Sequence, residues 1–159
     1  MQNKVFSELS DLENNQVLII SLCAWAIAQV LKVVVVLFQE RRLAWNYFVI
    51  SGGMPSSHTA TVCALATSIA MTVGMKSIYF SIAAVLAAIV MYDSAGVRQS
   101  VGQQGAILNR LVKEFSFKVS KSEREKDLKE FIGHTPFQVF IGAVLGILIA
   151  WTWITLSGR

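Results

Sequence analysis

Residues 54–73 read MPSSHTATVCALATSIAMTV, in which a proline, two serines and a histidine stand directly ahead of an apolar stretch. Proline is tolerated in the first turn of a helix, and serine or threonine side chains cap helix starts. The stretch therefore predicts a helix N-terminus that carries the imidazole of His58. Such a terminus offers N–H groups and the positive end of the helix dipole, which attract phosphate.

A second cluster of the same kind, Gly133-His134-Thr135-Pro136, precedes the last apolar stretch of the chain. The chain has two histidines and two prolines, so both residue types occur in these two clusters alone. Two imidazoles at two helix starts suggest phosphoryl chemistry with one nucleophile and one proton donor.

The composition is typical of a membrane protein. Hydrophobic residues make up 54% of the 159 residues and charged residues 15%, which is too apolar for an ordinary soluble domain. We therefore expect one all-α domain over residues 1–159, a polytopic membrane helical bundle. Residues 1–16 are expected to be a polar segment before the first span. No metal site and no cofactor are expected, because no Cys/His cluster has metal-ligand spacing.

About four membrane helices are expected, since ~20 apolar residues cross the ~30 Å hydrocarbon core. The first covers about residues 17–38 and the last about residues 137–156. Between them, residues 59–92 are interrupted by Gly74-Met75-Lys76-Ser77 and predict two helices of about sixteen residues. This pair either crosses a thinned bilayer or forms a hairpin that stops short of the far surface, and the sequence does not decide between the two.

Residues 99–130 are expected to form an interfacial or cytoplasmic connection. Ser122-Glu123-Arg124-Glu125 fits a capping box that opens a short charged helix. Ahead of it, apolar residues recur at helical spacing and predict an amphipathic helix that lies on the membrane surface. These residues are Val101, Leu108, Leu111, Val112 and Phe115.

Several cationic and titratable residues are expected on one membrane face. His58, Arg98 and His134 are separated by even numbers of crossings, and Arg41 and Arg42 follow the first span on the same side. The loops of this face carry ten Lys or Arg residues, against three on the other face, so the positive-inside bias places it in the cytoplasm. The ten are Arg41, Arg42, Arg98, Arg110, Lys113, Lys118, Lys121, Arg124, Lys126 and Lys129.

Lys32 lies within the first span, toward the same face. A lysine near a span end can snorkel to the interface. An ionisable residue inside a span is also a functional candidate by default. The position alone leaves both interpretations open.

These motifs resemble those of a known family. Pro55-Ser56-Ser57-His58 is similar to the Pro-Ser-Gly-His motif of the type 2 phosphatidic acid phosphatase and vanadium-dependent haloperoxidase superfamily. The chain resembles most closely the divergent branch of that superfamily, which consists of small membrane proteins of bacteria and plants. The matching segments are residues 28–32, 51–58, 91–98 and 133–136, in the order of the branch.

The resemblance implies a lipid phosphate phosphatase that works through a phosphohistidine and requires no metal. It assigns His134 as the nucleophile and His58 as the acid that protonates the leaving oxygen. It assigns Lys32, with Ser56 and Ser57, to hold the phosphate. The expected protein is an integral protein of the bacterial inner (plasma) membrane with its active site facing the cytoplasm.

The chain departs from the superfamily pattern at the arginines. The expected positions hold Gln39 in the first motif and Asp127 and Leu128 in the third. An arginine must therefore come from elsewhere, and Arg98 is the choice because it lies on the correct face. Arg41 and Arg42 are the further candidates.

A second departure is Gln138, which stands four residues after His134 where the superfamily has an aspartate. A glutamine amide can orient the imidazole but supplies no charge to stabilise the imidazolium. We therefore expect turnover to be weakened, or Asp93 to supply the carboxylate instead.

The sequence thus predicts a hydrolase of a lipid phosphomonoester or diphosphate, with the lipid and the membrane as partners and no nucleic acid. A homo-oligomer stays open. The alternative is a degenerate, non-catalytic protein that binds anionic lipids, with Gln138 as the supporting feature. A small transporter is a weaker third interpretation, because no internal repeat is evident.

Overall fold

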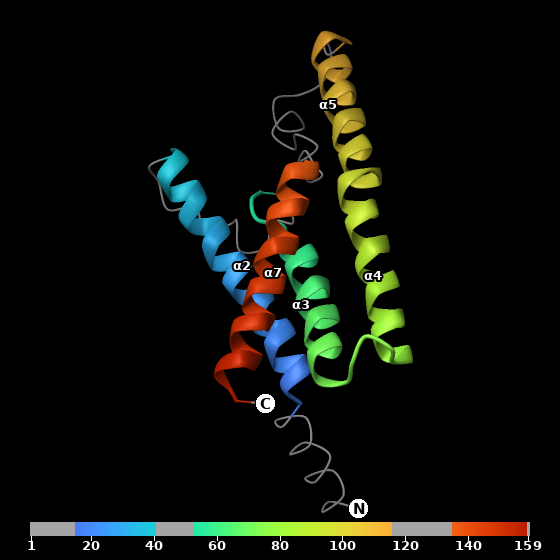
Figure 1. The fold of residues 1–159 in the computed structure, drawn as a ribbon. Coiled ribbons are helices and arrows are strands. Elements are labelled where there is room, and N and C mark those ends of the chain that lie inside the picture. The colour runs from blue at the N-terminus through green and yellow to red at the C-terminus, as the bar shows by residue number, and fades with distance from the viewer. Residues whose placement is uncertain (1–14, 41–52, 116–134, 159) are drawn as a thin grey trace, which may run out of the picture.

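A computed structural model describes residues 15–40, 53–115 and 135–158 (Figure 1). Within these ranges every regular element is a helix, which confirms the all-α prediction. The helices are α2 (Gln16–Glu40), α3 (Ser57–Thr72), α4 (Ile78–Ala95), α5 (Val97–Phe115) and α7 (Pro136–Leu156).

The short helix α3 stands at the centre of the bundle, where it packs against α2, α4 and α7. Consecutive helices from α2 to α4 run in alternating directions, and α7 descends alongside α3 (Figure 1). As a result α2 ends, α3 begins, α4 ends and α7 begins at the same end of the bundle. This end, called the polar end below, is the one that the crossing pattern predicts for the two histidine clusters.

Side-chain caps fix where three of the helices begin. Ser56 caps α3, Ser77 caps α4 and Thr135 caps α7, each by accepting a backbone N–H three residues on. Such caps satisfy N–H groups that a helix start leaves without an intrahelical partner. Between α3 and α4, Gly74 adopts φ +102°, a left-handed conformation that suits glycine.

Three of the described helices are long and apolar enough to cross a membrane: α2, α4 and α7. The helix α3 has 16 residues, which span about 24 Å at 1.5 Å per residue, less than the ~30 Å core. The expected count of about four spans is therefore not confirmed, and three are supported. The difference arises because α3 is short and carries several serines and threonines, which its position between other helices shields from lipid.

The predicted amphipathic helix exists as α5, but its direction differs from the expectation. Gly96 donates its N–H to Tyr92 O at 2.9 Å and accepts from the Ser100 N–H at 3.0 Å. Helical hydrogen bonding thus passes through the junction, and α5 continues nearly in the direction of α4 (Figure 1). An in-plane surface helix would need a sharp turn here. The predicted charged helix near Ser122 lies outside the described residues.

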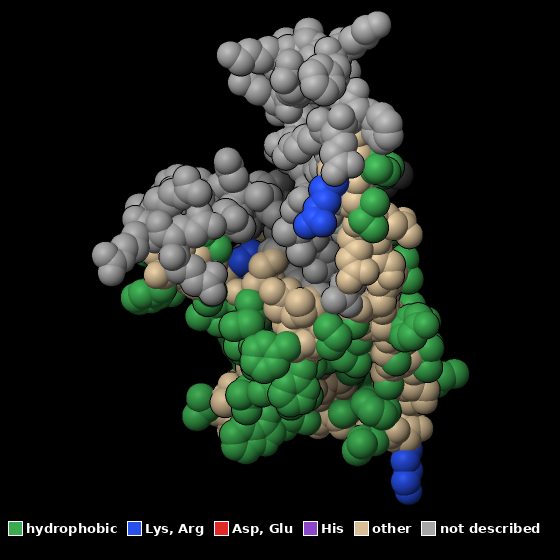
Figure 2. Space-filling model, turned by 90° about the horizontal axis from the view of Figure 1, so that it is seen from above, with side chains coloured by type: hydrophobic (Ala, Val, Ile, Leu, Met, Phe, Trp, Pro, Cys, Tyr) green, Lys and Arg blue, Asp and Glu red, His purple; other side chains and the backbone are tan. Residues whose placement is uncertain are grey.

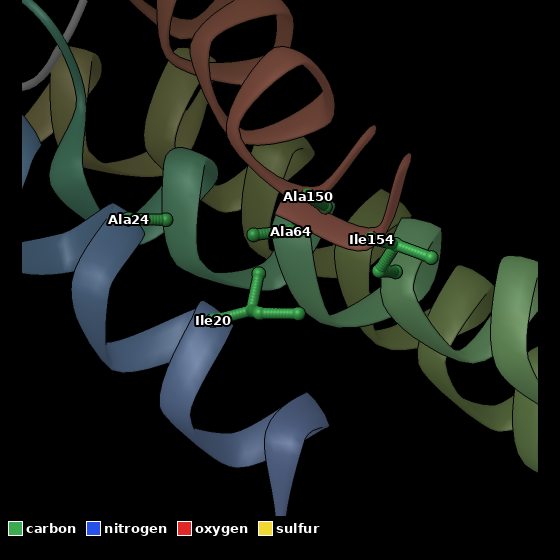
Figure 3. Close-up of a cluster of buried hydrophobic side chains, with 5 residues drawn as sticks. All are labelled: Ile20, Ala24, Ala64, Ala150 and Ile154. Atoms are coloured by element: carbon green, nitrogen blue, oxygen red, sulfur yellow. The ribbon is translucent and has the colours of Figure 1, made fainter. Parts of the chain in front are cut away.

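A cluster of buried hydrophobic side chains, most of them small, lies in the half of the bundle away from the polar end (Figure 3). Close approach of helix backbones is what small residues provide in membrane bundles. The cluster comprises Ile20 and Ala24 of α2, Ala64 of α3, and Ala150 and Ile154 of α7.

Two glycines of α7, four residues apart, lie at its contact with α3. A Cβ added at Gly142 would stand 2.5 Å from Ser56 O, and one added at Gly146 would overlap Ala60 O. Both glycines are thus required for the observed distance between the two helices.

Large hydrophobic side chains cover the outer faces of the described helices (Figure 2). Examples are Phe38, which is 80% exposed, and Ile78, which is 70% exposed. An apolar exterior of this extent marks a surface made for lipid.

Candidate functional site

Most of the buried polar side chains within the described ranges gather toward the polar end. In the opposite half, by contrast, a cluster of apolar side chains forms the core, and Ser21 and Ser68 are the buried polar residues described there. We call the first group the polar cluster. It comprises Gln29 and Lys32 of α2, Ser56, Ser57 and Thr59 at the start of α3, and Ser94 near the end of α4.

Lys32 is fully buried and its Nζ donates to Gln29 Oε1 at 2.8 Å. Gly53, with φ +94°, covers the lysine stem, because a Cβ added there would lie 3.2 Å from Lys32 Cγ. This contact brings together the first two motifs identified in the sequence. Complete burial does not fit a lysine that snorkels to the interface, so the functional interpretation of Lys32 is favoured.

The start of α3 is held by a network inside the helix turn. Ser56 Oγ accepts from the Thr59 N–H at 3.5 Å and from Thr59 Oγ1 at 3.0 Å. Ser56 and Ser57 are both buried, whereas His58 is exposed on the first turn. The serine side chains thus shape the helix start, and the imidazole stands at its surface.

The start of α7 is a capping box. Thr135 Oγ1 accepts from the Gln138 N–H at 3.3 Å, and Gln138 Oε1 accepts from the Thr135 N–H at 3.1 Å. This role of Gln138 was not predicted from the sequence, although Thr135-Pro136-Phe137-Gln138 fits the Ser/Thr-x-x-Glu/Gln signature. Gln138 therefore anchors the turn that directly follows His134.

A backbone bond joins the two helix starts. The Ser56 N–H donates to Gln138 O at 3.3 Å, and Gly142, one turn further along α7, faces Ser56 O. Residues 53–58 and the first turn of α7 are therefore in direct contact at the polar end.

Several predicted site residues fall where the structure gives no side-chain position. His134 directly precedes Thr135 in the sequence but lies outside the described residues, as do Arg41 and Arg42. Arg98 is in the first turn of α5 at the polar end, with its side chain outside the described part. Their predicted roles stay predictions.

The position of Asp93 along the bundle axis follows from the contact between α3 and α4. Cys63 Sγ lies 4.0 Å from Met91 Sδ. Because the two helices are antiparallel, one turn toward the polar end brings Ser94 to about the level of Thr59. Asp93 is half-buried beside Ser94, so it lies at the same end of the bundle as Lys32 and His58.

The chemistry available here is anion binding. Among the residues that the structure describes, no group of three or more His, Cys, Asp or Glu side chains is arranged to hold a metal ion. The polar end instead offers a buried ammonium and two adjoining helix N-termini, whose dipoles favour negative charge.

Comparison with known proteins agrees with this picture. Residues 13–149 match the model of the Divergent PAP2 family. The chain is also 40% identical over 148 residues to a protein of Bacillus subtilis (strain 168) named "Uncharacterized membrane protein YuiD", with 87% of this chain and 94% of that protein covered. No solved structure matches the chain.

Proposed function

Since the chain belongs to the Divergent PAP2 family, we propose that it is a membrane phosphatase acting on a lipid phosphomonoester or diphosphate. His134 attacks phosphorus and forms a phosphohistidine, while His58 protonates the leaving oxygen. Water then hydrolyses the phosphohistidine. The reaction requires no metal, because cationic side chains and helix starts stabilise the developing charge.

The contact between the starts of α3 and α7 is the observation that carries this proposal. The Ser56 N–H bond to Gln138 O, 3.3 Å long, links a residue two positions before His58 to one four positions after His134. Two histidines that are 76 positions apart in the sequence thus belong to segments that meet at one backbone contact. This supports their action on the two sides of one phosphoryl group.

Phosphate binding is assigned to the cations and donors around this contact. Lys32 supplies a buried ammonium directly below the turn that contains Gly53. Ser56 and Ser57 belong to the α3 start, where the helix dipole favours an anion. A guanidinium from Arg98 completes the proposed set, with Arg41 and Arg42 as the other candidates.

A lipid substrate fits the surface of the molecule. The sides of the bundle are apolar, and most of the buried polar groups in the described ranges gather at one end. A phosphate at this end would leave its lipid tail beside the apolar helices, within the bilayer. The ten-to-three distribution of Lys and Arg further supports a site on the cytoplasmic side of a bacterial inner membrane.

The second candidate is a non-catalytic protein that binds anionic lipids. Gln138 favours it, because the amide oxygen accepts from the Thr135 N–H and a glutamine brings no negative charge to the His134 turn. Such a protein would keep the buried Lys32 ammonium and the two adjoining helix starts and lack turnover.

A phosphate-release screen in detergent tests the proposal. The substrates are phosphatidate, phosphatidylglycerophosphate, and a polyprenyl phosphate and diphosphate. We expect release from at least one lipid, loss of release and of an acid-labile phosphoenzyme in His134→Ala, and no loss in the control Ser157→Ala at the far end of α7. Wild-type rate in His134→Ala would refute the assignment. Lipid binding without release, in both the wild type and Gln138→Glu, would favour the second candidate.

A further inference from the structure

We infer that Gln29 is a positioning residue, which holds the Lys32 ammonium toward the phosphate without neutralising it. The inference rests on the proposed function and adds to it a residue to which the family motifs assign no role. It starts from the hydrogen bond of 2.8 Å between Lys32 Nζ and Gln29 Oε1.

The lysine side chain is held at two places. Gln29 and Lys32 are three residues apart on α2 and therefore share a face of the helix. Gln29 is 8% exposed and Lys32 0%, so their bond is shielded from solvent. Gly53 contacts the stem at Cγ and Cδ, while Gln29 holds the tip.

This double hold has a consequence for binding. A free lysine side chain has about 2 kcal/mol of rotamer entropy. With the stem under Gly53 and the tip on Gln29, that freedom is already lost before a ligand arrives. A charge fixed in advance stabilises an anion more than one that must be ordered on binding.

The residue type at position 29 also decides the charge of the pair. Gln29 supplies an acceptor oxygen but no charge, so the Gln29–Lys32 pair keeps the charge of the ammonium. A glutamate in its place would accept the same bond and reduce the charge of the pair to zero. A phosphate dianion would then lose most of its electrostatic attraction to the Gln29–Lys32 pair.

A purely structural role for Gln29 makes a different prediction. If Lys32 does not approach the phosphate and Gln29 serves only to satisfy its buried amine, Gln29→Glu would preserve both the fold and anion binding, because the acceptor is retained. In the positioning role, Gln29→Glu instead lowers the affinity for phosphate without lowering the stability of the fold.

The experiment uses the full chain in detergent and four variants. Gln29→Glu keeps the acceptor and adds a charge, Gln29→Met removes the acceptor at similar length, and Lys32→Met removes the ammonium. Ser21→Ala is the matched control, because Ser21 is a buried polar residue on the same helix whose Oγ donates to Val17 O, one turn earlier, at 2.7 Å. The probes are inorganic phosphate and dioctanoyl phosphatidate, measured by equilibrium binding, phosphate release and thermal unfolding.

We expect Gln29→Glu to unfold at or above the temperature of Gln29→Met and to bind both probes at least about tenfold more weakly than the wild type. KM for phosphatidate should rise by the same factor while kcat changes less. Ser21→Ala should bind as the wild type does.

Three outcomes would count against the inference. Phosphate affinity of Gln29→Glu within twofold of the wild type overturns it. Loss of binding in Lys32→Met with both Gln29 variants unchanged overturns the role of Gln29 and leaves the proposed function standing. Neither binding nor release in the wild type would overturn the proposed function and this inference together.

Discussion

Replacing Gly142 with alanine tests the contact on which the site depends. The added Cβ would stand 2.5 Å from Ser56 O and 3.2 Å from both Ser56 Cβ and Thr59 Cβ. A relaxed C···O contact is about 3.3 Å or more, so α7 must withdraw from α3 by about 0.8 Å. The bond from the Ser56 N–H to Gln138 O, 3.3 Å at present, would lengthen beyond hydrogen-bonding range.

The expected cost combines opposing effects. Overpacking costs typically about 1–3 kcal/mol, whereas alanine is favoured over glycine in a helix by about 1 kcal/mol. We therefore expect a net destabilisation of up to about 2 kcal/mol relative to the wild type, or up to roughly 8 °C in Tm for a chain of this size. Relative to a helical glycine-to-alanine change that meets no neighbour, the expected cost is the full overpacking term of about 1–3 kcal/mol. A displacement of about 1 Å between catalytic groups can cost about 10²-fold in rate. The kcat/KM for the best lipid phosphate should fall by that order.

The matched control is Gly105→Ala on α5. Gly105 is also a helical glycine, but a Cβ added there meets nothing within 4 Å. Thermal unfolding and phosphate release are measured for both variants in the same detergent. If Gly142→Ala matches Gly105→Ala in stability and in rate, the α3–α7 contact does not assemble the site and the reasoning is wrong.

Three further predictions follow from the site and the topology. Gln138→Glu should retain the capping box, because glutamate also suits the third position of the helix. It should raise kcat by about 10²-fold with little change in KM. Equal kcat for the two forms would exclude residue 138 as the partner of the His134 imidazole and favour Asp93. Phosphate release should persist in excess chelator, and strict dependence on added Mg²⁺ would contradict the metal-free mechanism. Single cysteines in a background lacking Cys23 and Cys63 test the orientation in the membrane. Val101→Cys, at an exposed position of α5, should resist impermeant thiol reagents in intact cells, whereas Met75→Cys, in the turn between α3 and α4, should react. The reverse labelling pattern would invert the proposed orientation.

Much of the fold is predictable from the sequence because apolar runs and their interruptions are local signals. The turn at Gly74 lies where the composition changes and separates α3 from α4, whereas helical hydrogen bonding continues past Gly96 between α4 and α5. The direction in which α5 leaves α4 cannot be predicted from such local signals. Its pattern of apolar residues predicts an amphipathic helix but does not say whether the chain bends at Gly96. That depends on the bond that the Gly96 N–H donates to Tyr92 O and on the bond that Gly96 O accepts from the Ser100 N–H.

The site was predictable in composition and less so in geometry. The lysine, the serines and the two helix starts follow from motifs and capping rules. The residues that Gly142 contacts could not be predicted in this way, because a small-xxx-small pattern indicates a contact face but not which helix packs against it. The role of Gln29 could be predicted in part. Its spacing of three residues from Lys32 permits a side-chain hydrogen bond, but its burial depends on the neighbouring helices.

The central position of α3 has a consequence for how the chain is made. This helix is too short to cross the core by itself and carries buried polar residues, among them Ser57, Thr59 and Ser68. Its shield is completed by α7, which follows α2, α3 and α4 in the chain and contacts α3 through Gly142 and Gly146. Until α7 has been synthesised, α2 and α4 are the described helices that can cover α3. The nascent chain thus acquires the α3–α7 contact only after the other described helices have been made.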